Sequence, residues 1–359
     1  MKYVDEFRDR HIIDKLAAAI RREAGDGRAY NFMEVCGTHT MNIFRFALKD
    51  ILPKHINLIS GPGCPVCVTP NEFIDKAIWL ANRDDVIIAT FGDMFKVPGS
   101  RSSLEKEKAR GAEIKMVYSS IDALSLAKSN PDKEVVFLGI GFETTVPTVA
   151  QSILIAKHEK IRNYSVLCGH KTMPEALKLL AEDKNVNIDG FLLPGHVSAI
   201  IGSKPYEFLA KQFGKKCVIA GFEPVDILQA ILMLTRQASP KIDIQYTRII
   251  NRNGNRIAQK TTEKVFRKTD SVWRGIGKIS GSGQRTRDEF SEFDAESKFK
   301  PKIAAPREDK GCFCGEILKG TKTPFDCRLF GKACKPENPV GACMVSSEGT
   351  CAAYYKYIR

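Results

Sequence analysis

Residues 56–67 read INLISGPGCPVC, and this stretch decides the fold class of the chain. The apolar run 56–60 predicts a β-strand, and the glycines and prolines after it predict a tight loop. A helix is predicted over residues 71–82, and further strands are predicted over residues 30–35 and 86–93. Strands, loops and helices that alternate in this way are typical of an α/β fold with a parallel sheet.

The alternation is interrupted once and then resumes. The sequence SNPD at residues 129–132 breaks the first round, and a second round of strands and helices follows. The triplet GFE occurs at Gly141 and again at Gly221, each time where a strand is predicted to turn into a helix. We therefore expect two similar parallel-sheet α/β domains, over residues 30–128 and 129–238.

The two ends of the chain do not follow this alternation. From Pro240 the pattern changes: a strand is predicted over residues 242–250, and residues 280–290 (SGSGQRTRDEF) read as an exposed loop. Residues 239–359 are expected to form a smaller, cysteine-rich iron–sulfur domain. Residues 1–29 contain an amphipathic helix, which we expect to pack on that C-terminal domain.

Composition excludes several classes of protein. The 359 residues are 43% hydrophobic and 27% charged, which is typical of a globular protein of two or three domains. The net charge is +13, but the basic residues are spread along the chain and no nucleic-acid-binding motif is present, so no nucleic-acid partner is expected. No apolar stretch is long enough for a membrane helix. Because the N-terminal residues are charged rather than apolar, a cytoplasmic location is expected.

The last fifth of the chain, Gly311–Arg359, holds six of the eleven cysteines in the pattern C-x-C-x12-C-x6-C-x8-C-x7-C. This segment has too few apolar residues to fold by burial alone, so a covalent or metal link must hold it. Structural disulfides are rare in the cytosol, and zinc sites usually show paired C-x2-C knuckles that are absent here. An iron–sulfur cluster with four cysteines, plus a redox pair from the other two, uses all six; a zinc site remains the alternative.

The motif Cys64-Pro65-Val66-Cys67 lies between a predicted strand and a predicted helix. In an α/β protein this spacing suggests thiol–disulfide chemistry, because the start of a helix lowers the pKa of a thiol and the short loop lets the two sulfurs meet. Half of a zinc knuckle, or two buried structural thiols, would give the same sequence.

Cys36-Gly37-Thr38-His39 follows the strand predicted over residues 30–35. A soft thiolate and an imidazole in one turn suit a transition metal, although two ligands require others to complete the coordination. Isolated Cys and His residues near strand ends are more often structural. Because both cysteine motifs follow strands of one predicted parallel sheet, Cys36, His39, Cys64 and Cys67 are expected to converge at one edge.

Three weaker signals follow predicted strands in the second round. Gly139-x-Gly141-x2-Thr144 resembles a dinucleotide-binding fingerprint, but a threonine replaces the third glycine, and the turn is equally explained by helix capping. His170 and His196 each follow a glycine at the end of a strand. They would line the same cleft, or they are ordinary loop histidines.

In combination these motifs are specific, and the chain resembles the hydrogenase maturation factor HypD family over nearly its whole length. The resemblance is carried, in sequence order, by CGTH at 36–39, GPGCPVC at 61–67, GFETT at 141–145, LPGHV at 193–197 and the tail, with CFCG at 312–315, PVGACMV at 339–345 and EGTC at 348–351.

The resemblance implies two α/β domains and a third domain that holds a [4Fe–4S] cluster, in a setting similar to ferredoxin:thioredoxin reductase. It implies an assembly scaffold with thiol-redox chemistry rather than a free-standing metabolic enzyme. With the small protein HypC, such a scaffold assembles the transient Fe(CN)2CO unit of [NiFe]-hydrogenases, and the partner HypE supplies cyanide as thiocyanate.

Carried over by position, the resemblance also assigns site residues. Cys36 would bind the iron together with a cysteine of HypC, His39 would lie beside it, and Cys64 and Cys67 would form a redox pair. In the tail, Cys314 would pair with Cys343. The cluster ligands would be Cys312, Cys327, Cys334 and Cys351.

Two other functions fit the same cysteines. A thiol–disulfide oxidoreductase similar to ferredoxin:thioredoxin reductase would reduce disulfides without partner proteins, and Cys36 and His39 would be dispensable. A structural zinc-ribbon adaptor would bind zinc and be colourless.

Overall fold

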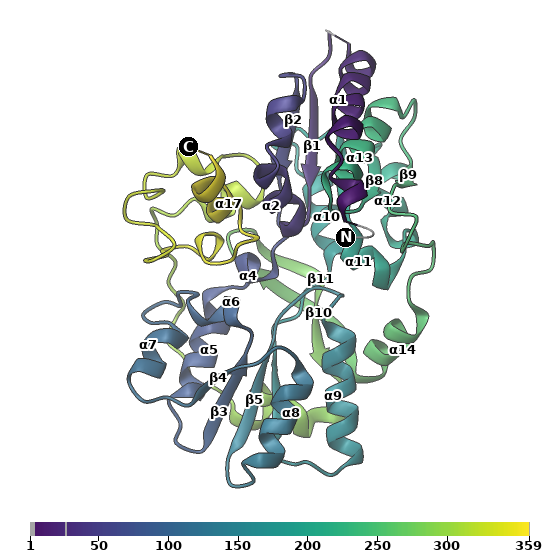
Figure 1. The fold of residues 1–359 in the computed structure, drawn as a ribbon. Coiled ribbons are helices and arrows are strands. Elements are labelled where there is room, and N and C mark those ends of the chain that lie inside the picture. Colours follow the sequence, from purple (N-terminus) through teal and green to yellow (C-terminus); the bar gives the residue numbers. More distant parts are fainter. Residues whose placement is uncertain (1–3, 26, 359) are drawn as a thin grey trace.

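The chain folds into two lobes, each built on a parallel β-sheet covered by helices, with a cysteine-rich segment beside them (Figure 1). The computed structural model describes residues 4–25 and 27–358. Sheet A has the strand order β2 (Ile56–Ser60), β1 (Tyr30–Glu34), β7 (Gly190–Pro194), β8 (Lys216–Ala220) and β9 (Ile242–Ile244). Sheet B has the order β4 (Ile114–Met116), β3 (Val86–Thr90), β5 (Glu134–Gly139) and β6 (Tyr164–Cys168). The expected fold class, two similar parallel-sheet α/β units with a smaller cysteine-rich part, is confirmed.

The helices are short and alternate with the strands. Around sheet A lie α1 (Arg10–Ala24), α2 (Gly37–Arg45), α3 (Leu48–Ile51), α11 (Gly195–Ile201), α12 (Glu207–Lys211) and α13 (Pro224–Arg236). With sheet B lie α5 (Asn71–Ala81), α6 (Gly92–Phe95), α7 (Leu104–Ala109), α8 (Ser120–Ser129), α9 (Val146–His158) and α15 (Ala295–Phe299). The others are α4 (Pro65–Val68), α10 (Met173–Glu182), α14 (Arg256–Val265), α16 (Cys314–Leu318) and α17 (Thr350–Tyr357), with 3-10 turns η1 (Asp5–Phe7), η2 (Lys204–Tyr206), η3 (Asp288–Phe293), η4 (Pro324–Asp326) and η5 (Ala342–Met344).

Each sheet combines strands from before and after residue 128, so the expected domain boundary between residues 128 and 129 is wrong. The chain leaves sheet A after β2, builds the whole of sheet B, and returns to sheet A at β7. There β7 pairs with β1, and Phe32 lies opposite Gly190. Two rounds of alternating strands and helices look the same in sequence whether they build one sheet each or share both, because local periodicity does not encode which strands pair.

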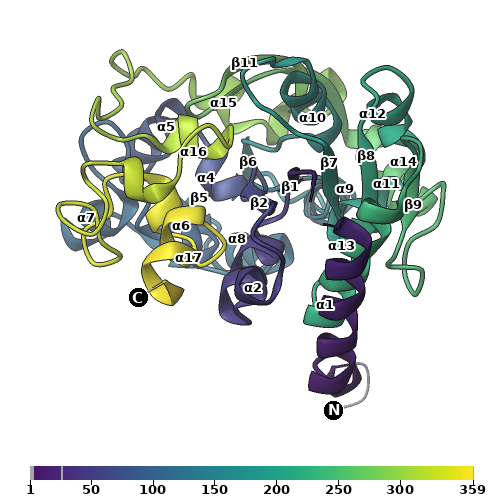
Figure 2. The same cartoon turned by 90° about the horizontal axis from the view of Figure 1, so that it is seen from above.

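The N-terminal helix packs on sheet A's lobe and not on the C-terminal domain as expected. Helix α1 lies along α13, and the two project together from the body (Figure 2). Ile20 and Ala24 of α1 belong to the same buried cluster as Ile231 of α13, and Arg236 forms an ion pair with Glu23 at 2.9 Å. The apolar face that the sequence predicted is present, but its partner is α13.

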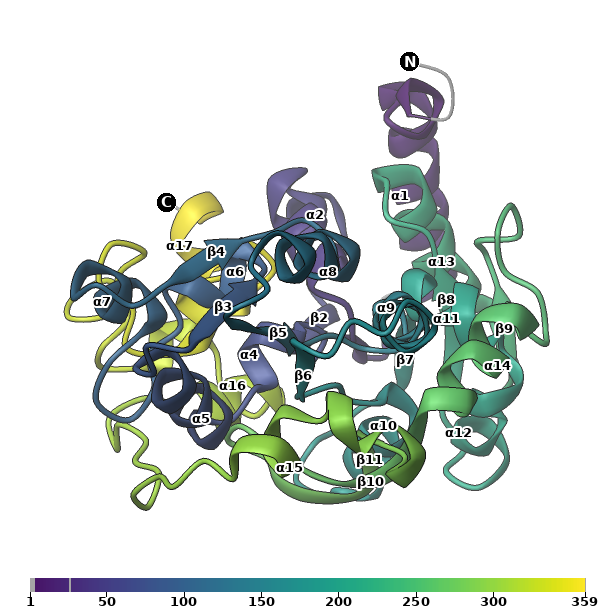
Figure 3. The ribbon, with the colours of Figure 1, turned by 90° about the horizontal axis from the view of Figure 1, so that it is seen from below.

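Residues 239–310 do not belong to the cysteine-rich part either, which corrects the expected 239–359 domain. Strand β9 completes sheet A and ends at Ile244, short of the predicted 250. The segment read as an exposed loop is strand β11 (Gly277–Thr286), which pairs antiparallel with β10 (Phe266–Trp273). This hairpin lies beside α10 and α15 (Figure 3). Its serines and glycines resemble a loop in the sequence. In the structure Ser282 is buried and accepts a hydrogen bond from the Trp273 indole N–H at 2.9 Å.

The cysteine-rich segment, residues 311–358, shares its core with both lobes. One buried cluster includes Met33 of β1, Leu138 of β5, Trp273 of the hairpin, and Cys314 and Cys343. The lobes and the segment are therefore packed into one body around the cysteines. Among the described residues, no helix combines the length and the apolar character needed to span a bilayer.

Candidate functional site

The site begins where strands β1 and β2 end side by side. These strands are parallel neighbours in sheet A, so the loops that follow them meet at one edge. The backbone N–H of Gly37 donates a hydrogen bond to the Gly63 carbonyl at 3.1 Å. A Cβ on Gly63 would lie 2.2 Å from the backbone nitrogen of Cys36, so only glycine allows this approach. The predicted meeting of the CGTH and GPGCPVC loops is confirmed.

Cys36 is held over a buried carboxyl group that sequence reasoning missed. The Cys36 backbone N–H donates to Oε2 of Glu34 at 3.2 Å, and the Thr40 hydroxyl donates to Oε1 at 2.5 Å. Burial raises the pKa of Glu34 to about 8, against the opposing effect of these hydrogen bonds. Nothing in the strand sequence YNFME distinguishes this glutamate from an exposed one.

The Cys36 thiol is buried and protonated in the folded protein. Burial and, to a lesser degree, the nearby Glu348 carboxyl group raise its pKa to about 12. Glu348 belongs to the cysteine-rich segment and accepts a hydrogen bond from the Thr38 hydroxyl at 2.6 Å. A cation that displaces the proton of Cys36 would therefore bind a thiolate that has the carboxyl groups of Glu34 and Glu348 nearby.

His39 presents an unused ring nitrogen. Its Nε2 lies 2.8 Å from the Gly221 carbonyl oxygen, which only an N–H can satisfy, so Nε2 carries the proton. The other nitrogen, Nδ1, is buried and has no partner among the described residues. Burial lowers the pKa of His39 to about 4, so the ring is neutral. Phe222 lies between His39 and His196, with ring centroids 4.9 and 3.8 Å away, which fixes both rings beside the second GFE triplet.

The CPVC motif connects this edge to the cysteine-rich segment. Cys64 caps helix α4, and its sulfur accepts a hydrogen bond from the Cys67 backbone N–H at 3.3 Å. Cys67 is fully buried, and helix α4, which carries it, packs against the turn η5, which carries Cys343. Burial is also the main reason why the pKa of Cys67 is raised. The CPVC motif therefore lies between the Cys36 turn and the cysteine-rich segment.

All six tail cysteines line one small cavity. Its other walls are apolar and include Ile317, Leu329, Phe330 and Met344. The sulfurs of Cys314 and Cys343 are 2.8 Å apart. All eleven cysteines are free thiols in this structure. The lining cysteines are Cys312, Cys314, Cys327, Cys334, Cys343 and Cys351.

The donor set of this cavity fits a cluster better than a single ion. Across residues 4–25 and 27–358, no three His, Cys, Asp or Glu side chains converge closely enough to hold one metal ion. A tetrahedral zinc needs four donors around one point, whereas a [4Fe–4S] cluster takes one thiolate on each of four irons, so its ligands surround a volume. Six thiols around a shared cavity provide the four ligands that a cluster requires, with two to spare.

The remaining predicted motifs lie elsewhere. The GFETT turn is filled by its own contacts: a Cβ on Gly141 would lie 1.8 Å from the Thr145 hydroxyl, and Oε1 of Glu143 accepts the Met173 backbone N–H at 3.0 Å. His170 lies at the end of β6 with its Nδ1 3.3 Å from the sulfur of Cys168. His196 contacts the Cys36 site only through Phe222.

The comparisons with known proteins show which family the chain belongs to. A family model named HypD, described as the hydrogenase formation hypA family, matches residues 11–358. The chain belongs to the HypD family.

Relatives in this family match over their full length. The chain is 49% identical to the hydrogenase maturation factor HypD2 of Bradyrhizobium diazoefficiens, over 100% of this chain and 97% of that protein. It is 48% identical to hydrogenase maturation factor HypD of Cupriavidus necator, over 100% and 98% of the two chains. It is 44% identical to hydrogenase maturation factor HypD of Escherichia coli, over 99% and 98%. The resemblance to the HypD family that the motifs indicated is thus confirmed, and this is a hydrogenase maturation family.

Proposed function

We propose that this chain is a cytoplasmic scaffold that, with HypC, holds an iron ion while it is converted to the Fe(CN)2CO unit of [NiFe]-hydrogenases. The observation that carries the proposal is the close succession of thiol-bearing segments from the tail to the Cys36 turn. The sulfurs of Cys314 and Cys343 are 2.8 Å apart, the turn that carries Cys343 packs against the helix that carries Cys67, and the loop before that helix packs against the backbone of Cys36.

In this proposal the iron is cargo and Cys36 is its ligand on this chain. A thiolate is a soft ligand suited to an iron that also binds cyanide and CO. Loss of the Cys36 proton on metal binding supplies that thiolate, because metal ligands bind deprotonated. His39, three residues after Cys36, has an Nδ1 atom without a hydrogen-bond partner among the described residues, which the sequence alone does not show. Because the ring is neutral, this nitrogen can accept a hydrogen bond or bind a metal ion. HypC would supply a further cysteine, and HypE would deliver cyanide as thiocyanate.

The thiol pairs accept and donate electrons in this proposal. Reductive release of cyanide from thiocyanate needs two electrons, and a dithiol that closes to a disulfide gives up two. We assign Cys314 with Cys343, and Cys64 with Cys67, to this role. Their burial keeps them away from oxidants in solvent.

The cluster would be held by Cys312, Cys327, Cys334 and Cys351. When bound, a [4Fe–4S] cluster supplies one electron at a time to a neighbouring disulfide. The 2.8 Å separation of the Cys314 and Cys343 sulfurs supports leaving this pair out of the ligand set.

A thiol–disulfide oxidoreductase is the second candidate, and the same Cys314–Cys343 contact favours it. One experiment separates the two. The chain is co-produced with HypC and HypE, purified without oxygen, and examined by infrared spectroscopy for metal-bound cyanide and CO. Bands are expected for the wild type, and Cys36→Ser should reduce them by at least about tenfold, because it removes the thiolate ligand.

Cys64→Ser tests the thiol route, and Cys168→Ser is its matched control because Cys168 lies at the end of β6, in the other lobe. Normal bands in Cys64→Ser would show that electrons do not pass through the CPVC pair. Absence of bands in the wild type, together with reduction of protein disulfides that does not depend on Cys36, would favour the oxidoreductase.

A further inference from the structure

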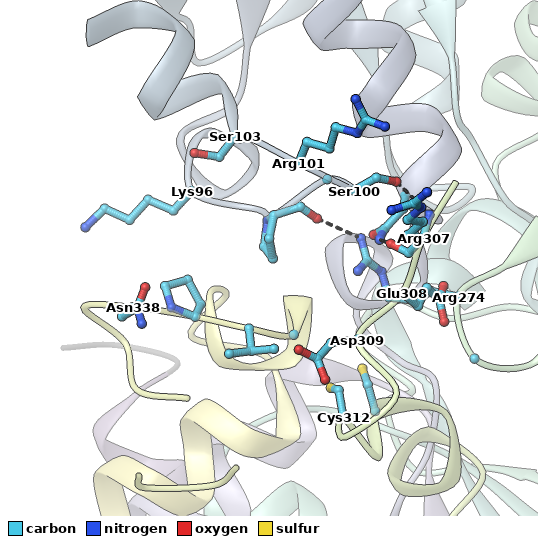
Figure 4. A pocket seen from close by; sticks show the side chains of 18 of the residues that line it. Lys96, Ser100, Arg101, Ser103, Arg274, Arg307, Glu308, Asp309, Cys312 and Asn338 are labelled. Carbon is cyan, nitrogen blue, oxygen red and sulfur yellow. Dashed lines mark hydrogen bonds between the residues drawn. The ribbon is translucent and has the colours of Figure 1, made fainter. Parts of the chain in front are cut away.

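A basic pocket opens beside the tail cysteines (Figure 4). Its volume is about 690 Å³, which is the size of a small-molecule site. It is lined by the loop that follows α6 on one side and by the start of the cysteine-rich segment on the other. Cys312 and Cys314 line it, whereas Cys343 does not.

Arg274 gives this pocket a buried positive charge without a counter-ion. The side chain is 5% exposed, its Nε donates to the Thr69 carbonyl at 2.7 Å, and one terminal nitrogen donates to the Pro98 carbonyl at 3.5 Å. The other terminal nitrogen has no hydrogen bond, and no carboxylate of a described residue forms an ion pair with this guanidinium. A buried charge that is not paired is costly, so the site favours an anion.

The rim of the pocket adds further positive charge. Seven basic side chains face five acidic ones, which are Glu105, Glu308, Asp309, Glu316 and Glu337. Glu105 lies 3.9 Å from Lys96, so these two charges offset each other, and Asp309 accepts the Gly311 backbone N–H at 2.8 Å. Besides Arg274, the basic side chains are Lys96, Arg101, Lys106, Arg307, Lys310 and Lys319.

We propose that this pocket binds a small anionic thiol, with its carboxylate or phosphate at Arg274 and its sulfur at Cys314, and that this thiol reduces the Cys314–Cys343 disulfide. The inference rests on the proposed function for the pairing of these two cysteines. It also gives the thiol route a direction, because Cys314 lines the pocket while the turn that carries Cys343 packs against the helix that carries Cys67.

The exchange balances without any other reductant. The thiolate of the small molecule attacks the sulfur of Cys314, the bond to Cys343 breaks, and Cys343 leaves as a thiolate that takes a proton. A second molecule of the thiol then attacks the mixed disulfide on Cys314. The products are the small-molecule disulfide and the two reduced cysteines, so two electrons enter the protein.

The test measures disulfide reduction in the full chain, without partner proteins or cargo iron. Glutathione is the anionic probe, and 2-mercaptoethanol is the neutral probe of similar reactivity. Alkylation and mass spectrometry follow the appearance of free Cys314 and Cys343. We expect Arg274→Gln to slow reduction by glutathione about tenfold and reduction by 2-mercaptoethanol less than about twofold, since only the charged probe uses the guanidinium.

Two further variants distinguish the loss of a positive charge from a folding defect caused by Arg274→Gln. Arg101→Gln on the exposed rim should slow glutathione about twofold to threefold, because the charge it removes is screened by solvent. Lys204→Gln, an exposed lysine that does not line the pocket, should leave both probes unchanged. Trapped adducts of glutathione are expected on Cys314 and not on Cys343.

Equal slowing of both probes by Arg274→Gln with no effect of Arg101→Gln, or adducts on Cys343, would overturn the assignment of this pocket and leave the scaffold function standing. A protein in which no Cys314–Cys343 disulfide forms would overturn the pocket assignment and the proposed redox pair together. The infrared bands on cargo iron report on Cys36 and are independent of both outcomes.

Discussion

The Cys36 turn and the cysteine-rich segment both hold buried thiols in place, but by different means. The Cys36 turn follows β1, and the loop that it contacts follows β2. The parallel pairing of these two strands positions the turn without a bound metal. The cysteine-rich segment has only two short helices, α16 and α17, and two 3-10 turns, and its interior is largely the six sulfurs and a few apolar side chains. The first region is therefore formed by the sheet itself, whereas the second has little backbone structure of its own. Under the proposed function, a scaffold that releases its cargo but keeps its own cofactor would need this difference.

Removal of the bound metal gives the sharpest test of this contrast. If a cluster supplies part of the folding energy of the segment, its removal by oxidation and chelation should lower amide protection in residues 311–358 by at least about 100-fold. Strands β1 and β7 should change by less than about threefold, because backbone pairing holds them. Hydrogen exchange followed by mass spectrometry, before and after removal, provides the measurement. Equal loss in both regions would mean that the Cys36 turn is not independently formed.

Gly63→Ala tests whether the Cys36 turn depends on the close contact between its two loops. The new Cβ would meet the Cys36 backbone at 2.2 Å, and backbone cannot move aside cheaply. We expect a loss of about 3 kcal/mol in the free energy of unfolding. The matched control is Gly92→Ala, whose Cβ meets nothing closer than the sulfur of Met116 at 3.9 Å, and which should cost less than about 1 kcal/mol. Urea denaturation measures the free energy of unfolding of both variants. A loss in Gly63→Ala no larger than that in Gly92→Ala would show that the loops separate easily.

The buried Glu34 makes the stability of the Cys36 turn depend on pH. The folded pKa is raised to about 8, whereas the unfolded value is about 4.3, so between these pH values the folded state binds more protons. Stability from this group therefore falls as pH rises through that window. In Glu34→Gln this component disappears, and the variant should gain about 3.5 kcal/mol relative to the wild type between pH 5 and pH 8.

The control for this pH dependence is Glu289→Gln, an exposed position whose variant should follow the wild type at every pH. Unfolding free energies from urea titrations at several pH values give the comparison. A Glu34→Gln variant with the slope of the wild type would mean that the carboxyl group is ionised in the folded state.

The hydrogen bond from Thr38 to Glu348 joins the two regions, and its loss should have the smallest effect. Thr38→Val keeps the shape of the side chain but removes the donor to a largely buried carboxyl group, which should cost about 1–2 kcal/mol. Thr321→Val removes an exposed hydrogen bond inside the segment, to the Glu316 carbonyl, and should cost about 0.5 kcal/mol or less. Thermal unfolding measures both. Equal costs would show that Thr38 does not couple the regions.

Local sequence predicted most strands and helices but not their partners. Strand β2 has the bounds that its apolar run indicated, because alternation between apolar runs and glycine turns is a local signal. The division into domains and the partner of α1 were wrong for the same reason: pairing of distant segments is decided by the shared core. Strand β11 was missed because its small polar residues are acceptable in a sheet only when a partner such as Trp273 covers them.

The sequence by itself determined the α/β class, the positions of the cysteine motifs at the ends of strands, and membership of the HypD family, because each depends on residues that are close together in the chain. Only the tertiary structure decided that Glu34 lies buried beneath Cys36, that Nδ1 of His39 has no partner, and that Arg274 lines a pocket at Cys314. These properties depend on burial and on groups far apart in the chain, and burial is set by how the lobes and the cysteine-rich segment pack.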